Sequence, residues 1–278
     1  MTFDTKANIL IEDSIKDSFP DFSFSTTDIL GHSFGQPEAG TEPDNLDKRI
    51  QHAIGSSKTC LYSSHRFKPQ ICFFDMDATV IKEESIVVLA ESAGQSQRVA
   101  QITEDAMQGR ISFKEALRSR VELLAGLPSC VITETHQKLT LQPGIELLCS
   151  WLKHSNIPYY LVSGGFHQLA DKIAADLGFS GVRANRLGIA DGKLTGRVEG
   201  EIINGAKKAE YLNQTVMSAG KDRSAILSVG DGANDRAMMQ ESALTIGFSP
   251  KKALIPYLLG ANYSGDHLVL LEFLKKLS

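Results

Sequence analysis

The sequence has few cysteines and no long apolar run, and each shortage excludes a class of protein. The 278 residues include only four cysteines, Cys60, Cys72, Cys130 and Cys149, and none of them forms a Cys-x-x-Cys pair. This spacing favours neither a zinc site nor a disulfide framework, and it suits a reducing compartment. No segment reaches the roughly 18 consecutive apolar residues of a membrane span, and the first residues lack the basic and apolar regions of a secretory signal. We therefore expect a cytoplasmic protein with no membrane partner.

Positive charge is also scarce. The chain has 29 Lys and Arg residues against 33 Asp and Glu residues, which gives a formal net charge of −4. A protein that coats nucleic acid needs a basic surface, so we expect no nucleic-acid partner. The apolar share of 42% and the charged share of 22% are ordinary for a globular protein. The length predicts one large domain or two modest ones, and the composition indicates no particular oligomeric state.

We interpret residues 1–68 as an amino-terminal extension of uncertain order. Gly, Pro, Ser and acidic residues break up the stretch 31–45. Only two short apolar patches stand out, Ile9–Ile11 and Leu46–Ile54, and these suit a strand and a helix.

From residue 69 onward, short apolar runs alternate with segments whose apolar residues recur at helical spacing. This alternation predicts an α/β fold with a Rossmann-like, doubly wound parallel sheet. An all-helical stretch interrupts the alternation directly after the first strand. We therefore interpret residues 83–141 as an inserted helical cap, and residues 69–82 and 142–278 as the core of the fold. The main strands are predicted at 71–74, 158–162, 225–229 and 244–246.

Three of these strands end in polar loops, which begin at Asp75, Ser163 and Gly230. In open α/β sheets ligands bind beyond the carboxyl ends of the strands, so we expect the three loops to converge on one site. Four carboxylates in one crevice repel one another unless a cation lies among them, and a set of oxygen ligands suits Mg²⁺. The predicted Mg²⁺ site consists of Asp75, Asp77, Asp231 and Asp235.

Two other interpretations of these motifs are weaker. An EF-hand calcium loop starting at Asp75 needs glycine at its sixth position and glutamate at its twelfth, where the chain has Val80 and Ile86. A dinucleotide-binding loop starting at Gly230 needs a third glycine where the chain has Asp235, whose charge repels a pyrophosphate.

Four stretches, in chain order, resemble the motifs of the haloacid dehalogenase (HAD) superfamily. In addition, residues 104–121 are similar to the cap of its phosphoserine phosphatase branch, and residues 191–196 to that branch's hairpin. The resemblance covers about residues 69–276, and four ordered motifs with a matching cap are highly specific. The four stretches are Asp75-Met-Asp77-Ala-Thr79-Val80, Ser163-Gly-Gly-Phe166, Lys208 and Gly230-Asp-Gly-Ala-Asn-Asp235.

The resemblance implies roles for the acidic residues. Asp75 would attack phosphorus and form an aspartyl-phosphate, and Asp77 would act first as a general acid and then as a general base. Asp75, Asp231 and the backbone carbonyl of Asp77 would hold Mg²⁺, with Asp235 as a further ligand or as an anchor of the site. Ala78 replaces the serine usual in the family, which affects only a minor contact.

The resemblance assigns the phosphate of the substrate to the other motifs. Lys208 would offset the charge on the transferred group, and its neighbour Lys207 is the alternative. The hydroxyl of Ser163 and the N–H of Gly164 would bind phosphate oxygens at a helix N-terminus, together with Asn234.

The resemblance places the amino-acid end of the substrate in the cap. Glu84 would pair with its ammonium, and Arg120 would bind its carboxylate in a bidentate fork. Met107 and Phe113 would close an apolar lid. In the alternative interpretation, Met107 and Phe113 are ordinary cap core and Arg120 lies on a solvated helix face.

We therefore expect a Mg²⁺-dependent enzyme that hydrolyses O-phospho-L-serine, the last step of serine synthesis. One alternative is the same chemistry on another small phosphomonoester, or phosphate transfer from phosphoserine to homoserine. A second alternative is a non-catalytic regulatory protein built on the same fold.

Overall fold

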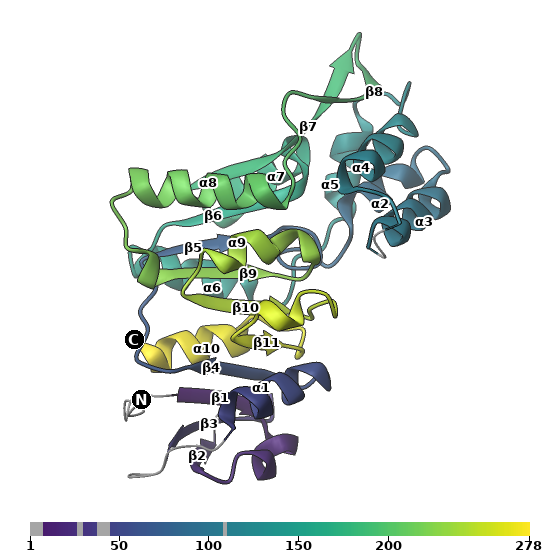
Figure 1. The fold of residues 1–278 in the computed structure, drawn as a ribbon. Coiled ribbons are helices and arrows are strands. Elements are labelled where there is room, and N and C mark those ends of the chain that lie inside the picture. The colour runs from purple at the N-terminus through teal and green to yellow at the C-terminus, as the bar shows by residue number, and fades with distance from the viewer. Residues whose placement is uncertain (1–7, 27–29, 38–44, 108–109) are drawn as a thin grey trace.

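A sheet of eleven strands runs through the part of the chain that the computed structural model describes, residues 8–26, 30–37, 45–107 and 110–278. The strand order is β2-β3-β1-β4-β11-β10-β9-β5-β6-β7-β8, and helices cover both faces (Figure 1). Within these ranges, no helix combines the length and the apolar character needed to cross a lipid bilayer.

The strands from β11 to β7 are parallel, which confirms the predicted Rossmann-like α/β fold. Their bounds are β5 (Ile71–Phe74), β6 (Tyr159–Phe166), β7 (Gly181–Ala190), β9 (Ile226–Gly230), β10 (Leu244–Phe248) and β11 (Gly260–Asn262). Strand β5 is apolar throughout because both of its faces are covered. Ile71 and Phe73 belong to the hydrophobic cluster of α8 (Gly205–Ser218) and α9 (Arg236–Gln240). Cys72 and Phe74 belong to the cluster of α6 (Ile145–His154), α7 (His167–Leu177) and α10 (Leu268–Leu277).

The described part of the extension contains strands and helices that lengthen the same sheet. The two apolar patches form β1 (Asn8–Glu12) and α1 (Leu46–Gly55), as expected. The sequence did not indicate β2 (Phe22–Thr26), β3 (His32–Pro37) or β4 (Cys60–Ser63). Antiparallel pairing joins β1 to β3 and β4, and β4 joins the parallel strands through β11.

The described residues of the segment predicted as a cap form four helices that lie beside the hairpin of β7 and β8 (Figure 1). Helix α4 begins where expected, since Ser112 and Glu115 form a capping box. The boundaries at residues 68, 82 and 141 remain a prediction. The bounds of these elements are α2 (Ser85–Glu91), α3 (Ser96–Met107), α4 (Phe113–Glu122), α5 (Val131–Lys138) and β8 (Lys193–Glu199).

Candidate active site

The carboxyl ends of β5, β6 and β9 meet at one edge of the sheet, because the three strands are parallel neighbours. Residues at and after these ends line a cavity of about 420 Å³ whose other wall comes from the cap. The structure thus brings most of the predicted site residues around one space. Those lining it are Asp75, Asp77, Gly164, Asp231 and Asn234 from the core and Glu84, Phe113 and Arg120 from the cap.

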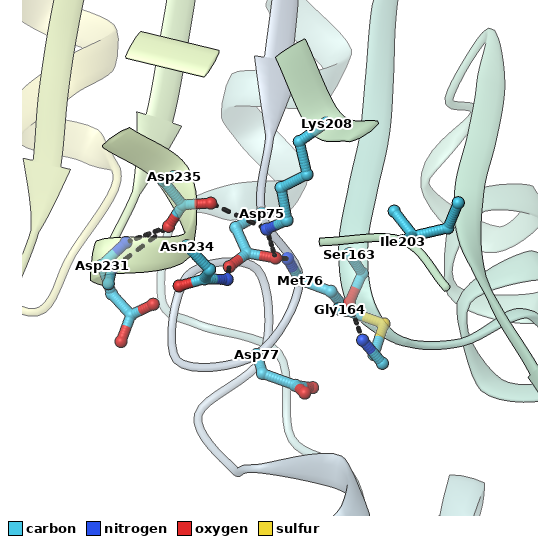
Figure 2. Close-up of polar contacts among 12 residues, drawn as sticks. Asp75, Met76, Asp77, Ser163, Gly164, Ile203, Lys208, Asp231, Asn234 and Asp235 are labelled. Atoms are coloured by element: carbon cyan, nitrogen blue, oxygen red, sulfur yellow. Dashed lines mark hydrogen bonds and ion pairs between the residues drawn. The ribbon is translucent and has the colours of Figure 1, made fainter. Parts of the chain in front are cut away.

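Asp75 is held by a network of hydrogen bonds at the base of this cavity (Figure 2). Its Oδ1 accepts a bond of 2.7 Å from the following backbone N–H and lies 2.8 Å from Lys208 Nζ, while its Oδ2 accepts a bond of 3.2 Å from Asn234. Lys208 is fully buried, and its Nζ also lies 2.7 Å from Asp235. Burial lowers the pKa of Lys208, but the carboxylates of Asp235 and Asp75 raise it by more, so the pKa lies above its usual value. The alternative lysine, Lys207, pairs instead with two surface glutamates.

Asp235 shapes the loop that carries Asp231. Its Oδ2 accepts bonds of 3.2 and 3.1 Å from the backbone N–H groups of Asp231 and Gly232, and its Oδ1 binds Lys208. Both oxygens are engaged and the side chain is fully buried, so Asp235 is suited to anchor the loop, and its part as a further metal ligand stays a prediction. Asp231 lines the cavity, and burial raises its pKa to about 6 even though Lys251 opposes this shift.

Asp77 lies apart from the cluster around Lys208 (Figure 2). Its carboxylate accepts bonds of 3.1 Å from the hydroxyl and 3.3 Å from the backbone N–H of Ser85. Desolvation, together with the negative charges of Glu84 and Asp75, raises the pKa of Asp77 well above its usual value. The next residue, Ala78, adopts a φ of 53°, a left-handed conformation that is uncommon for alanine and that turns the chain sharply after Asp77.

The carboxyl-terminal part of β6 holds the predicted phosphate-binding residues. Ser163 is fully buried, and its hydroxyl accepts a bond of 2.8 Å from the N–H of Gly165. A Cβ added to Gly164 would lie 3.2 Å from the ring of Phe113, so a cap side chain closes over this end of β6. Asn185, which sequence reasoning missed, donates a bond of 2.8 Å to the carbonyl of Gly164 and thereby holds this end of β6.

Arg120 is 8% exposed, so the alternative of a solvated helix face is wrong. Its guanidinium donates to the carbonyl of Ala116 at 3.2 Å and to the hydroxyl of Thr103 at 3.1 Å. Among the described residues, no carboxylate forms an ion pair with it, although it lines the cavity. A buried guanidinium that has no direct ion pair is suited to bind an anionic group of a ligand. The side chain of Met107 lies outside the described part of the structure.

Two further residues of the site were not singled out from the sequence. Lys251 follows β10, and its Nζ lies 2.9 Å from Asp231 and 3.2 Å from Glu84. A signal for it existed, because β10 was predicted and its carboxyl end lies at the same edge of the sheet. His267 is fully buried, and its Nε2 bonds the carbonyl of Thr79 at 2.8 Å, which ties down the loop after Asp75.

Comparisons with known proteins agree with this geometry. A family model for haloacid dehalogenase-like hydrolases matches residues 72–240. The chain belongs to this family. The hydrolase is 39% identical over 207 residues to the phosphoserine phosphatase of Lactococcus lactis, a match that covers 73% of this chain and 94% of the relative. It is 38% identical over 193 residues to the phosphoserine phosphatase of Archaeoglobus fulgidus, a match that covers 69% of this chain and 56% of the relative. A solved structure described as a phospho-aspartyl intermediate analogue of phosphoserine phosphatase has a TM-score of 0.71 and 35% identity, and it covers 74% of this chain and 99% of that one.

The acidic cluster of this hydrolase fits a small divalent cation. Asp75, Asp231 and Asp235 each offer a carboxylate oxygen, and these oxygens lie within 4.8 Å of one another. The cluster contains only oxygen donors. Such donors favour hard cations such as Mg²⁺ over softer transition metals.

Proposed function

We propose that this HAD-like hydrolase is a phosphoserine phosphatase that converts O-phospho-L-serine and water into L-serine and phosphate. One observation carries the proposal: the buried guanidinium of Arg120, which forms no ion pair with any carboxylate of the described residues, shares a cavity with the carboxylates of Asp75 and Asp77. A substrate with an anionic group at each end suits such a cavity, and the phosphoserine phosphatases among the relatives support this choice. In a cell, the reaction would complete the synthesis of L-serine.

The arrangement suits a two-step mechanism. In the first step, a carboxylate oxygen of Asp75 bonds to phosphorus while the bond between phosphorus and the seryl oxygen breaks. Asp77 donates its proton to that leaving oxygen, and its raised pKa favours the protonated form that this requires. In the second step, Asp77 accepts a proton from water as the water oxygen bonds to phosphorus, and the bond to Asp75 breaks to release phosphate.

The remaining residues bind and orient the substrate. Lys208 stays protonated beside Asp75 and faces the negative charge of the transferred group. We propose Mg²⁺ as the metal, held by Asp75, Asp231 and the backbone carbonyl of Asp77, where its charge would draw electrons from the phosphoryl oxygens. Arg120 would receive the substrate carboxylate, and Glu84 its ammonium. Phe113 closes over Gly164 and limits the access of bulk water.

Phosphate release from a panel of small phosphomonoesters, with MgCl₂ or with EDTA, tests the proposal. We expect a preference for phosphoserine over phosphothreonine and over esters that lack the amino-acid end, and no release in EDTA. Addition of homoserine separates hydrolysis from transfer, since transfer would yield phosphohomoserine instead of phosphate. Asp75→Asn should be inactive; equal behaviour of this variant and the wild type would favour the non-catalytic alternative.

A further inference from the structure

Lys251 has no part in the proposed mechanism, although it lines the active-site cavity. Its Nζ lies 2.9 Å from Asp231 Oδ2 and 3.2 Å from Glu84 Oε1. Its backbone N–H also donates a bond of 2.8 Å to the carbonyl of Asp231. Lys251 therefore contacts Asp231, an acidic residue of the predicted cation site, through both its side chain and its backbone. It also contacts Glu84, near the start of the predicted cap.

The charge of Asp231 must be balanced from within the protein, because this residue is only 5% exposed. Lys208 is engaged by Asp75 and Asp235 at 2.8 and 2.7 Å. Within the described ranges, Lys251 is the basic residue that forms an ion pair with Asp231. A divalent cation bound by Asp231 would share that carboxylate with an ammonium, and like charges at such short range repel one another strongly when solvent is partly excluded.

We propose that Lys251 is a built-in competitor of the metal, an ammonium that balances Asp231 and lowers the affinity of the site for a divalent cation. This inference rests on the proposed function only in placing a cation at Asp75 and Asp231. By thermodynamic reciprocity, a bound cation weakens the contact between Lys251 and Asp231 by the same factor. Lys251 thus tunes how tightly the metal is held, and it links the metal loop to Glu84.

The test measures Mg²⁺ binding to the full chain, after EDTA treatment and dialysis, by isothermal titration calorimetry. Lys251→Met should bind Mg²⁺ about tenfold more tightly than the wild type, a typical size for coupling between neighbouring sites. Its melting temperature in EDTA should fall by about 3 °C, because Asp231 loses its counter-charge. Saturating MgCl₂ should remove this difference. Lys251→Arg, which keeps the charge, should behave as the wild type.

Lys252→Met is the matched control, since the neighbouring lysine is exposed, and it should change neither measurement. Unchanged or weaker Mg²⁺ binding by Lys251→Met would overturn the proposal. An equal fall of the melting temperature in EDTA and in MgCl₂ would also do so, because it indicates a purely structural role. Lys251→Gln is measured in parallel, so that the proposal is still tested if Lys251→Met fails to fold. No turnover is needed, so a protein that binds Mg²⁺ without hydrolysing phosphoserine refutes the proposed function but not this inference.

Discussion

Substitution of Arg120 by methionine should remove recognition of the substrate carboxylate while leaving the phosphoryl chemistry intact. Arg120 lies on α4 in the cap, whereas the reacting carboxylates follow strands of the core. The change therefore acts on one end of phosphoserine alone. Phosphoethanolamine, which has the same phosphate and ammonium but no carboxylate, provides the matched substrate.

The size of the effect follows from the contacts of the guanidinium. It has five N–H donors, and its bonds to Ala116 and Thr103 leave donors free to face the cavity. Removal of one partner of a buried charge pair costs about 2–5 kcal/mol. A loss of about 3 kcal/mol lowers kcat/KM for phosphoserine about 150-fold, at 1.4 kcal/mol for each factor of ten. The value for phosphoethanolamine should change little, so the preference between the two substrates should collapse.

The assay is the initial rate of phosphate release from each substrate, for the wild type, Arg120→Met and Arg118→Met. Arg118 is exposed on the same helix, so its substitution controls for loss of charge in the cap. Thermal unfolding of each variant verifies that the fold is kept. An equal loss on both substrates, or no loss on phosphoserine, would refute the assignment of Arg120 to the carboxylate.

Three further substitutions test the network around the site. Lys208→Met removes the cation between two buried carboxylates, so urea unfolding should show a loss of about 3–5 kcal/mol and phosphate release should stop. Lys207→Met, whose partners are exposed, should change the free energy of unfolding little. Burial lowers the pKa of His267 to about 4, so its contribution to stability is complete above the unfolded pKa of about 6.5 and is lost as the pH falls toward 4. In His267→Phe the melting temperature should therefore fall less steeply with decreasing pH in this range. An unchanged slope would contradict protonation of His267 as the cause. Asn185→Leu removes the bond to the carbonyl of Gly164, so inhibition by inorganic phosphate should weaken about fivefold, as competition assays would measure.

The central strands could be predicted because a parallel strand buried on both faces is an unbroken apolar run, and 71–74 is such a run. Convergence of the motifs then followed from topology, since neighbouring parallel strands end at one edge. Strands β2 and β3 lack this signal. They pair antiparallel near the edge of the sheet, and residues such as Ser23, Ser25 and Gln36 alternate with apolar ones too briefly to stand out. The formation of β3 depends on its pairing with β1, and that of β2 on its pairing with β3, and the local sequence of neither strand contains these contacts.

The cap and the loop after β10 show two limits of prediction from the sequence alone. Arg120 follows Ala116 and Leu117 by four and three residues, and the structure shows all three buried on the same face of α4. The sequence alone could not say whether that face meets solvent or a cavity. For the loop, Lys251 and Lys252 are equivalent by type, and only the turn after β10 directs one of them to Asp231.

The extension and the core form one hydrophobic unit, although the motifs begin only after residue 68. Leu10, Phe34 and Leu61 lie in the same cluster of buried side chains as Phe74 and Ile246 from the central strands. Strand β4 also covers the open edge of β11, which would otherwise expose unpaired backbone groups. Motif residues mark where the chemistry is, but the burial of β5 and β10, which fixes the position of Asp75, depends on side chains contributed by both parts of the chain.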